Sequence, residues 1–227
     1  MAQPVTARDW RLVGGRLSLD FVNTVVWRGS ARRRTGAATP ARLRQVEKLI
    51  RFDDLLSWAA AAGAVTPAEA GRMRRAASRQ PRQAARALAQ AIGLREALHR
   101  VVSAVVDGRT PGAPDLDVLN RALATARAHE RLTATRGRFA LTWDEAATLD
   151  RPLWPIARDA SGLLASARLD RVRRCGGEDC GWFFLDTTRN HSRQWCDMRD
   201  CGNLAKVRRF RERARRLART TSRSART

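Results

Sequence analysis

The sequence contains no tyrosine, only two lysines (Lys48 and Lys206), three histidines and four cysteines among its 227 residues. Alanine and arginine are abundant instead, which is typical of a GC-rich genome, so part of the formal net charge of +22 reflects composition. No stretch approaches the ~18 consecutive apolar residues that a membrane span needs, and the first ten residues lack the apolar core of a secretory signal. We therefore expect a cytoplasmic protein with reduced thiols and no membrane contact.

Catalytic motifs are also lacking. His99 and His129 fall in predicted helices without a cysteine or an acid at metal-binding spacing, so we expect ordinary core-edge or surface histidines. No nucleophile is paired with a base, and Gly14-Gly15 alone does not make a phosphate-binding loop. The sequence therefore predicts that the protein is not an enzyme.

The position of the positive charge is more informative than its sum. The 25 residues from Asn203 to the end contain ten basic residues and one acid, a net charge of +9, which leaves +13 for the other 202 residues. A charge concentrated in this way favours a polyanionic partner. A basic run elsewhere, at 30–44, is expected to be a solvated loop.

Most of the first 167 residues show apolar residues at helical spacing. With 44% apolar residues, the chain is long enough for one sizeable core and a small second unit. Asp20, Asn23 and Thr24 form the polar face of the first helix, where we expect capping and local hydrogen bonds. The alternating segment around Arg136-Gly137 predicts a hairpin at about 131–143. The predicted helices cover about 18–27, 52–63, 66–80, 81–106, 115–129, 151–169 and 203–219.

All four cysteines lie between residues 175 and 201, in two C-x4-C pairs, Cys175/Cys180 and Cys196/Cys201. Four thiolates complete the tetrahedral shell that zinc prefers, and short cysteine turns bring both sulfurs of a pair to one point. Buried free thiols, two disulfides or an iron–sulfur cluster are alternatives. The spacing and the reducing compartment favour one structural zinc ion, which four cysteines leave without an open catalytic position.

The residues around the cysteines complete a small module. Gly181 and Gly202 follow the second cysteine of each pair and are expected to turn the backbone so that amides face the sulfurs. The apolar run 182–185 predicts a strand that packs against the metal site, although its aromatic side chains could instead stack on bases. Arg189 and Arg193 belong to an expected exposed tip with donors suited to phosphate.

The last helix is expected to start at Asn203 as its N-cap. On a helical wheel one side is apolar, with Leu204, Val207, Phe210, Ala214 and Leu217, and should dock on the zinc unit. The other side presents guanidiniums that can fork onto phosphate or guanine. A membrane-surface helix is the alternative, but the apolar side is modest and lacks tryptophan. The predicted nucleic-acid contacts are Arg189, Arg193, Lys206, Arg208, Arg209, Arg215, Arg216 and Arg219.

These residues resemble a known family, the CGNR zinc finger. The segments that carry the resemblance are Cys175, Cys180-Gly181, Phe184-Leu185-Asp186, Trp195-Cys196, Cys201-Gly202-Asn203 and Ala205-Lys206. The N-terminal GGRLSLDFVNTVVWR and FDDLLSWA resemble the ABATE domain that commonly precedes this finger. One departure is Leu204, which stands where the family has an arginine.

The resemblance implies a bacterial stress-induced transcription regulator with a zinc-binding, DNA-binding C-terminus. We expect a mainly α fold: an ABATE-like helical domain with one small β-hairpin (1–167), a small treble-type four-cysteine zinc module ending in a basic helix (168–219), and a disordered tail (220–227). The expected partner is duplex DNA. RNA or single strands, a small-molecule effector for the N-terminal domain and a homodimer remain open.

Overall fold

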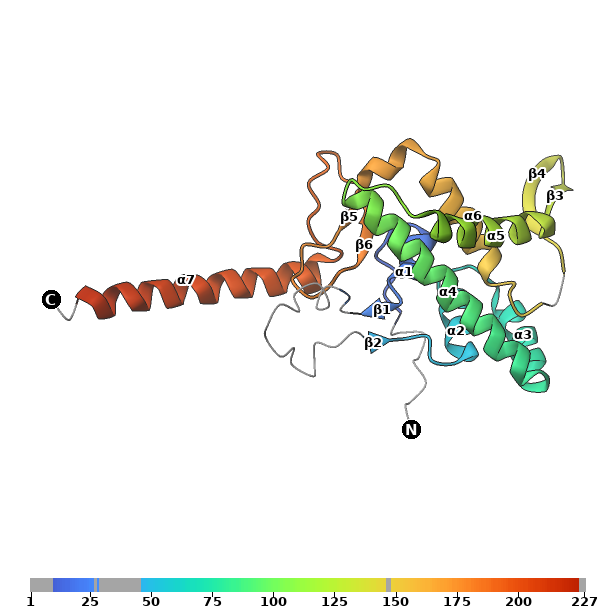
Figure 1. Cartoon of the computed structure of the whole chain (residues 1–227), viewed down its shortest axis with the longest axis horizontal. Coiled ribbons are helices and arrows are strands. Elements are labelled where there is room, and N and C mark those ends of the chain that lie inside the picture. Colours follow the sequence, from blue (N-terminus) through green and yellow to red (C-terminus); the bar gives the residue numbers. More distant parts are fainter. Residues whose placement is uncertain (1–9, 27, 29–45, 146–147, 225–227) are drawn as a thin grey trace.

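The computed structural model describes residues 10–26, 28, 46–145 and 148–224 (Figure 1). As expected, the chain is mainly helical, with small antiparallel two-stranded sheets β1–β2, β3–β4 and β5–β6. The predicted lead-in (1–11) falls mostly, and the basic loop (30–44) entirely, outside the described residues. The α-helices are α1 (Leu17–Val22), α2 (Phe52–Ala61), α3 (Pro67–Arg79), α4 (Pro81–Val106), α5 (Ala113–His129), α6 (Leu153–Leu164) and α7 (Asn203–Ser224). The strands are β1 (Val25–Val26), β2 (Val46–Glu47), β3 (Glu130–Thr135), β4 (Arg138–Trp143), β5 (Val172–Arg174) and β6 (Phe183–Leu185).

The short helix α1 lies at the centre of the core. Its side chains Leu19 and Phe21 are completely buried, and Phe21 packs against Trp58 of α2 with ring centroids 5.1 Å apart. Helix α6, strand β6 and the long helix α4 also contact α1 (Figure 1). None of the described helices combines the length and the apolar composition of a membrane span.

Local signals place several helix ends correctly. Glu69 donates its backbone N–H to the Thr66 hydroxyl (3.2 Å) and accepts from the Thr66 backbone N–H (2.7 Å), which is a capping box with Pro67 in the first turn. Helix α4 begins at Pro81 and ends at Val106, as the sequence predicts.

The predicted first helix is too long. We expected it to reach Trp27, but α1 ends at Val22 because Val25 and Val26 pair with β2; Trp27 itself lies outside the described residues. The expected local hydrogen bonds form at Asp20, which accepts from the Gly14 N–H (2.7 Å), and at Thr24, which donates to the Phe21 carbonyl (2.8 Å). Asn23 is the C-cap residue of α1, and its backbone N–H donates to the Leu19 carbonyl, but its side chain pairs with the distant Phe183 and not with a local group.

The sixth helix is also shorter than its predicted range of 151–169. Helix α6 begins at Leu153 and ends at Leu164, and a separate 3-10 turn, Ala167–Arg171, leads into β5. The predicted hairpin is confirmed, with Leu132 opposite Leu141 in its register. Arg136 (φ 50°) and Gly137 (φ 77°) both have the positive φ that a tight two-residue hairpin turn requires.

Candidate metal centre and nucleic-acid interface

The four cysteines come together at one point, as the spacing predicts. The sulfur atoms of Cys175, Cys180, Cys196 and Cys201 all lie within 4.8 Å of one another. The Sγ atoms of Cys180 and Cys196, and those of Cys196 and Cys201, are 3.6 Å apart, and all four thiols are free of disulfides. When four sulfurs surround a zinc ion tetrahedrally, each about 2.3 Å from the metal, neighbouring sulfurs are separated by nearly the same distance as the 3.6 Å seen here. The donor set therefore fits one structural zinc ion.

Backbone amides and neighbouring thiols tune the cluster. The N–H groups of Gly177 (3.4 Å) and Cys196 (3.3 Å) donate to the Cys175 sulfur. Hydrogen bonds from the other thiols lower the pKa of Cys175, whereas contact with Cys175 raises the pKa of Cys180 and Cys196. Because a charge on one sulfur opposes ionisation of the next, a divalent cation is what allows four thiolates to coexist.

The two cysteine pairs sit in different local structures. Cys175 and Cys180 form the turn between β5 and β6, and Gly181 after them has the expected positive φ of 69°. The second pair borders the start of α7, so along the chain the module runs β5, first cysteine pair, β6, second cysteine pair and helix; the first pair lies between the two strands and not before them, as a treble-type order would require. Gly202 does not have a positive φ; a Cβ there would lie 2.6 Å from the Met198 sulfur and 3.1 Å from the Trp195 ring, so both side chains would have to shift.

Asn203 does not cap the last helix, contrary to prediction. Helical turns begin earlier, in a π-helix from Met198 to Gly202 that continues into α7. Asp197 is the capping residue, and it accepts the Arg199 N–H at 2.8 Å. This hydrogen bond, with an ion pair to Arg11 (2.6 Å), lowers the pKa of Asp197 against the effect of its partial burial. The zinc ligand Cys201 thus lies inside the helical segment whose direction α7 follows.

The strand 182–185 is confirmed, and it joins the zinc module to the helical part. The side chain of Asn23 donates to the Phe183 carbonyl (2.8 Å) and accepts from its N–H (3.0 Å). The Trp182 indole donates to the Val25 carbonyl at 2.7 Å. Phe183 and Phe184 are fully buried, so core packing, and not base stacking, is their role. His99 of α4 lies against Phe183, with ring centroids 5.6 Å apart, as expected for a core-edge histidine.

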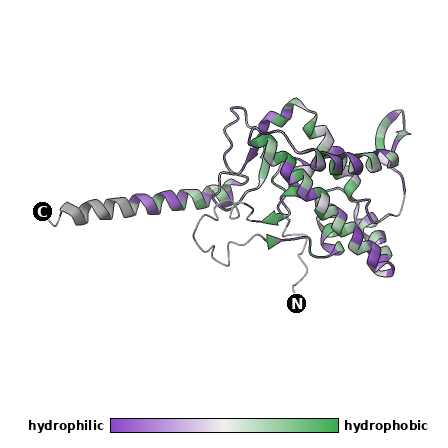
Figure 2. Cartoon of the chain, in the orientation of Figure 1, coloured by the Kyte–Doolittle hydropathy of each residue, from purple (hydrophilic) through white to green (hydrophobic). Residues whose placement is uncertain are grey.

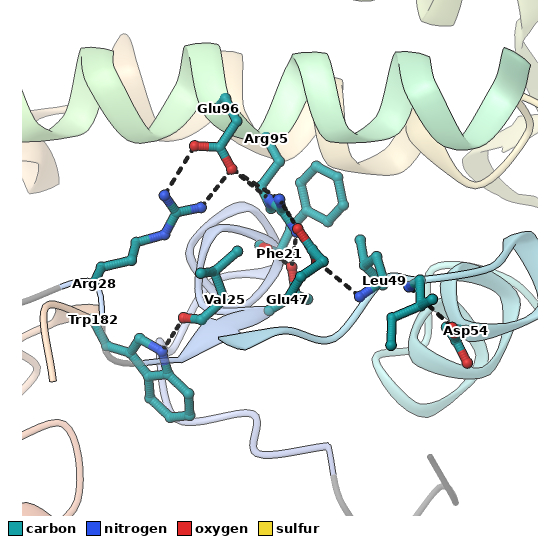
Figure 3. Close-up of polar contacts among 11 residues, drawn as sticks. Phe21, Val25, Arg28, Glu47, Leu49, Asp54, Arg95, Glu96 and Trp182 are labelled. Atoms are coloured by element: carbon teal, nitrogen blue, oxygen red, sulfur yellow. Dashed lines mark hydrogen bonds and ion pairs between the residues drawn. The ribbon is translucent and has the colours of Figure 1, made fainter. Parts of the chain in front are cut away.

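Two buried arginines, each paired with a partly exposed glutamate, hold β1, β2 and α4 together beside this junction (Figure 3). Arg95, only 1% exposed, contacts Glu47 through both terminal nitrogens (2.6 and 2.5 Å). Arg28 forks onto Glu96 in the same way (2.9 and 2.6 Å). Burial disfavours the Glu96 carboxylate, but Arg28 and Arg95 outweigh it and lower the pKa of Glu96 to about 2. The sequence offered one signal for this network, a charged Arg95 within the apolar stripe of α4.

Of the two arginines expected at the exposed tip, Arg189 is exposed and Arg193 is half-buried. The Arg193 guanidinium donates to the carbonyls of Trp195 (3.0 Å), Val13 (3.0 Å) and Cys196, and lies 4.3 Å from the Phe184 ring centroid. Its donors are therefore engaged in fixing the loop between the two cysteine pairs. In this structure Arg193 holds the zinc module to the N-terminal chain.

Helix α7 projects from the body of the molecule (Figure 1). Lys206 and Arg209 are exposed along it, and Arg208 forms ion pairs with Glu178 (2.6 Å) and Asp179 (3.5 Å). The backbone stays helical to Ser224, beyond the predicted end at 219, because no glycine or proline interrupts it. Residues 225–227 of the predicted tail lie outside the described residues. The same holds for the side chains of three predicted contacts on this helix, Arg215, Arg216 and Arg219.

The apolar side of α7 does not dock on the zinc unit as we expected. Leu204 is 53% exposed, Val207 39% and Phe210 74%. Figure 2 shows apolar and polar residues alternating along the described part of a helix that leaves the body. An amphipathic pattern says which side of a helix is apolar but not what covers it.

Comparison with protein families identifies both halves of the chain. Residues 15–167 match the ABATE model, described as "Putative stress-induced transcription regulator". Residues 171–214 match the CGNR zinc finger, the segment that contains the four-cysteine cluster. No curated protein matches the chain.

Proposed function

The chain belongs to the ABATE family and carries a CGNR zinc finger, and on that premise we propose that it is a bacterial, cytoplasmic transcription regulator that binds duplex DNA through α7. The zinc ion performs no chemistry in this proposal. It fixes the direction of a cationic helix.

The projecting basic helix is the observation that carries the proposal. Between Asn203 and Ser224 the sequence has nine basic residues and one acid, a net charge of +8. Because α7 stands away from the rest of the described structure (Figure 1), a duplex could approach it along its length without meeting the body. A helix of this width fits the major groove, where arginine can contact phosphates on either side or fork onto guanine.

The junction between metal and helix supports the same role. Cys201 lies within the turn that α7 continues, and Asp197 caps that turn while holding Arg11 of the N-terminal chain. A helix anchored at one end loses less conformational entropy on binding than a free one. A helix held in a fixed direction is suited to a partner of regular shape, such as the groove of a duplex.

A single-stranded target is the less favoured alternative. Proteins that bind single strands stack bases on exposed aromatic rings. Trp182, Phe183 and Phe184 are buried in the junction and offer no such surface. Phe210 is the exposed aromatic residue of α7, and one ring among arginines suits contact with a groove better than a stacking platform.

The proposal assigns phosphate and base contacts to the cationic side of α7. Lys206, Arg208, Arg209, Arg215, Arg216 and Arg219 contribute them, with Arg189 at the nearby tip as a further phosphate contact. Arg193, also predicted from sequence, is assigned no contact because its donors are engaged by carbonyls. Leu204 replaces the family arginine at the base of the helix, so this chain makes no charged contact there.

The test is binding of the zinc-loaded chain to a labelled duplex, measured by fluorescence anisotropy. Neutralising four arginines together (Arg208→Gln, Arg209→Gln, Arg215→Gln and Arg216→Gln) should weaken binding at least a hundredfold, since each phosphate contact adds counterion release. Zinc content should stay at one equivalent per chain. Unlabelled single-stranded DNA and structured RNA serve as competitors and should displace the duplex poorly.

A matched control separates this site from general positive charge. Neutralising four exposed arginines on α3 and α4 (Arg75, Arg79, Arg82 and Arg86) changes the net charge by the same amount. Helix α3 and the first turns of α4 lie far from α7 (Figure 1), so this variant should bind within a few-fold of the parent. Equal loss in the two variants would mean that α7 is not the binding site.

A further inference from the structure

The β3–β4 hairpin projects from the body of the molecule at the end opposite α7 (Figure 1). Only its base is packed: Trp143 lies against Trp154 of α6, with ring centroids 5.9 Å apart, and Glu130 pairs with Arg158 (3.0 Å). An isolated two-stranded hairpin is marginally stable in water. This one also exposes large apolar side chains.

The register of the hairpin sorts its side chains onto two unlike faces. Directly opposed residues share a face, so Leu132 with Leu141 and Ala134 with Phe139 continue outward from the packed base. Leu132 is 68% exposed, Phe139 73% and Leu141 50%. The opposite face carries Arg131 with Thr142, Thr133 with Ala140, and Arg138.

We propose that this apolar face is a dimer interface, in which the hairpins of two copies of the chain pack face to face. A two-fold axis would set the Leu132–Leu141 pair of one copy against the same pair of the other. The face is therefore complementary to itself. The arginines of the hairpin lie on its opposite face, away from the contact.

Charge is the reason to choose a second copy as the occupant. The chain carries a net charge of +22, so two copies repel each other over most approaches. The outer part of this face has no charged side chain, and the one acid at its base is already paired with Arg158. Two basic copies can meet here without placing arginine against arginine, whereas a charged partner of another kind would find no group to recognise.

The size of the face sets the expected strength. Each copy offers on the order of 400 Å² of apolar side chain, which is about half of what one partner contributes to a standard stable interface. We therefore expect a reversible dimer with a dissociation constant of about 10–100 µM. Since α7 lies at the far end of each copy, dimerisation would leave both basic helices unobstructed (Figure 1).

Analytical ultracentrifugation of the zinc-loaded full chain tests this proposal, without nucleic acid and with about 0.5 M salt to screen repulsion. The sedimentation coefficient should rise with concentration from about 5 to 300 µM, a range that brackets the expected dissociation constant. Phe139→Thr keeps a strand-forming residue and should weaken the dimer at least about tenfold. Hydrogen exchange at the same concentrations should show greater protection of β3 and β4 as the dimer forms.

The neighbouring residue provides the control. Arg138 is also exposed, on the opposite face, so Arg138→Thr should leave the dimer intact or strengthen it slightly by removing charge. The proposal is overturned if the parent stays monomeric to about 300 µM, well above the expected dissociation constant. It is also overturned if Phe139→Thr and Arg138→Thr affect the association equally, or if protection appears elsewhere than in the hairpin.

Discussion

Two buried titratable side chains respond to acid in opposite directions. Burial raises the pKa of Asp20 to about 6, against the hydrogen bonds that it accepts from Gly14 and Val13. Burial also lowers the pKa of His99 to about 4, and the charge of Arg28 adds to this. Since the two groups titrate over overlapping pH ranges, their effects on stability offset each other in the parent.

The free energy of unfolding of Asp20→Asn, measured relative to that of the parent, should be higher at neutral pH than at pH 4. Between about pH 4 and 6 the folded parent keeps a proton on Asp20 that the unfolded chain has released, so the parent loses stability through this group as pH rises. Removing the group removes that loss, which amounts to about 3 kcal/mol. Urea unfolding of variant and parent at each pH measures the difference, and the pH dependence of zinc binding cancels in this comparison.

His99→Gln should have the opposite effect. In the unfolded parent this histidine becomes protonated below about pH 6.5, whereas in the folded parent it stays neutral down to about pH 4. The free energy of unfolding therefore falls as the pH falls. The variant lacks this loss. Its free energy of unfolding relative to the parent should therefore be higher at pH 4 than at pH 7, by about 3 kcal/mol. Shifts of the same sign in both variants would show that burial does not govern these two groups.

Asn23 is the residue whose role the sequence hid. Local polarity predicted a capping residue, and Asn23 does end α1, but its side-chain amide also bridges both backbone groups of Phe183, 160 positions away. Asn23→Ala should lower the free energy of unfolding by about 2–4 kcal/mol, because it leaves a buried N–H and a buried carbonyl unpaired. Urea unfolding measures this loss. Asn190→Ala, at an exposed position, is the control and should change stability by less than about 0.5 kcal/mol.

At the scale of elements, the sequence was informative where no distant partner overrode the local signal. Helix α4 and the β3–β4 hairpin agree with their predicted ranges because periodicity and turn residues determine both. The cysteine cluster was predictable for the same reason, from spacing alone. Strands β1 and β2 have only two residues each and pair across a separation of about twenty positions, so no short segment signals them.

The last helix also shows that a local pattern does not predict long-range contacts. Its composition predicted a helix with one basic and one apolar side, and the structure has that helix. Docking of the apolar side depended on what the rest of the chain presents to it, which no helical wheel contains. The start at Met198 was missed because Asn203 is a good local cap, whereas Asp197 gains a second partner, Arg11, from the other end of the chain.

At the scale of the whole molecule, the zinc module and the helical part share one core. Phe183, Leu185 and Val172 of the module belong to the same buried cluster as Leu19 and Phe21 of α1. Removal of zinc by a chelator should therefore lower the melting temperature of the entire chain, in one transition, because metal binding to the folded state stabilises whatever unfolds with it. Circular dichroism and tryptophan fluorescence should report the same midpoint. A helical part that melts at an unchanged temperature after chelation would contradict a shared core.

The central claim is that α7, fixed by the zinc module, binds duplex DNA through its basic side. The most direct measurement is the duplex affinity of the zinc-loaded chain as a function of salt concentration. With about five arginines on phosphates, log K should fall against log salt with a slope of about −4 to −5, and the variant with four arginines of α7 neutralised should lose most of that slope. An affinity that does not depend on salt, or a slope that the variant retains in full, would contradict the account.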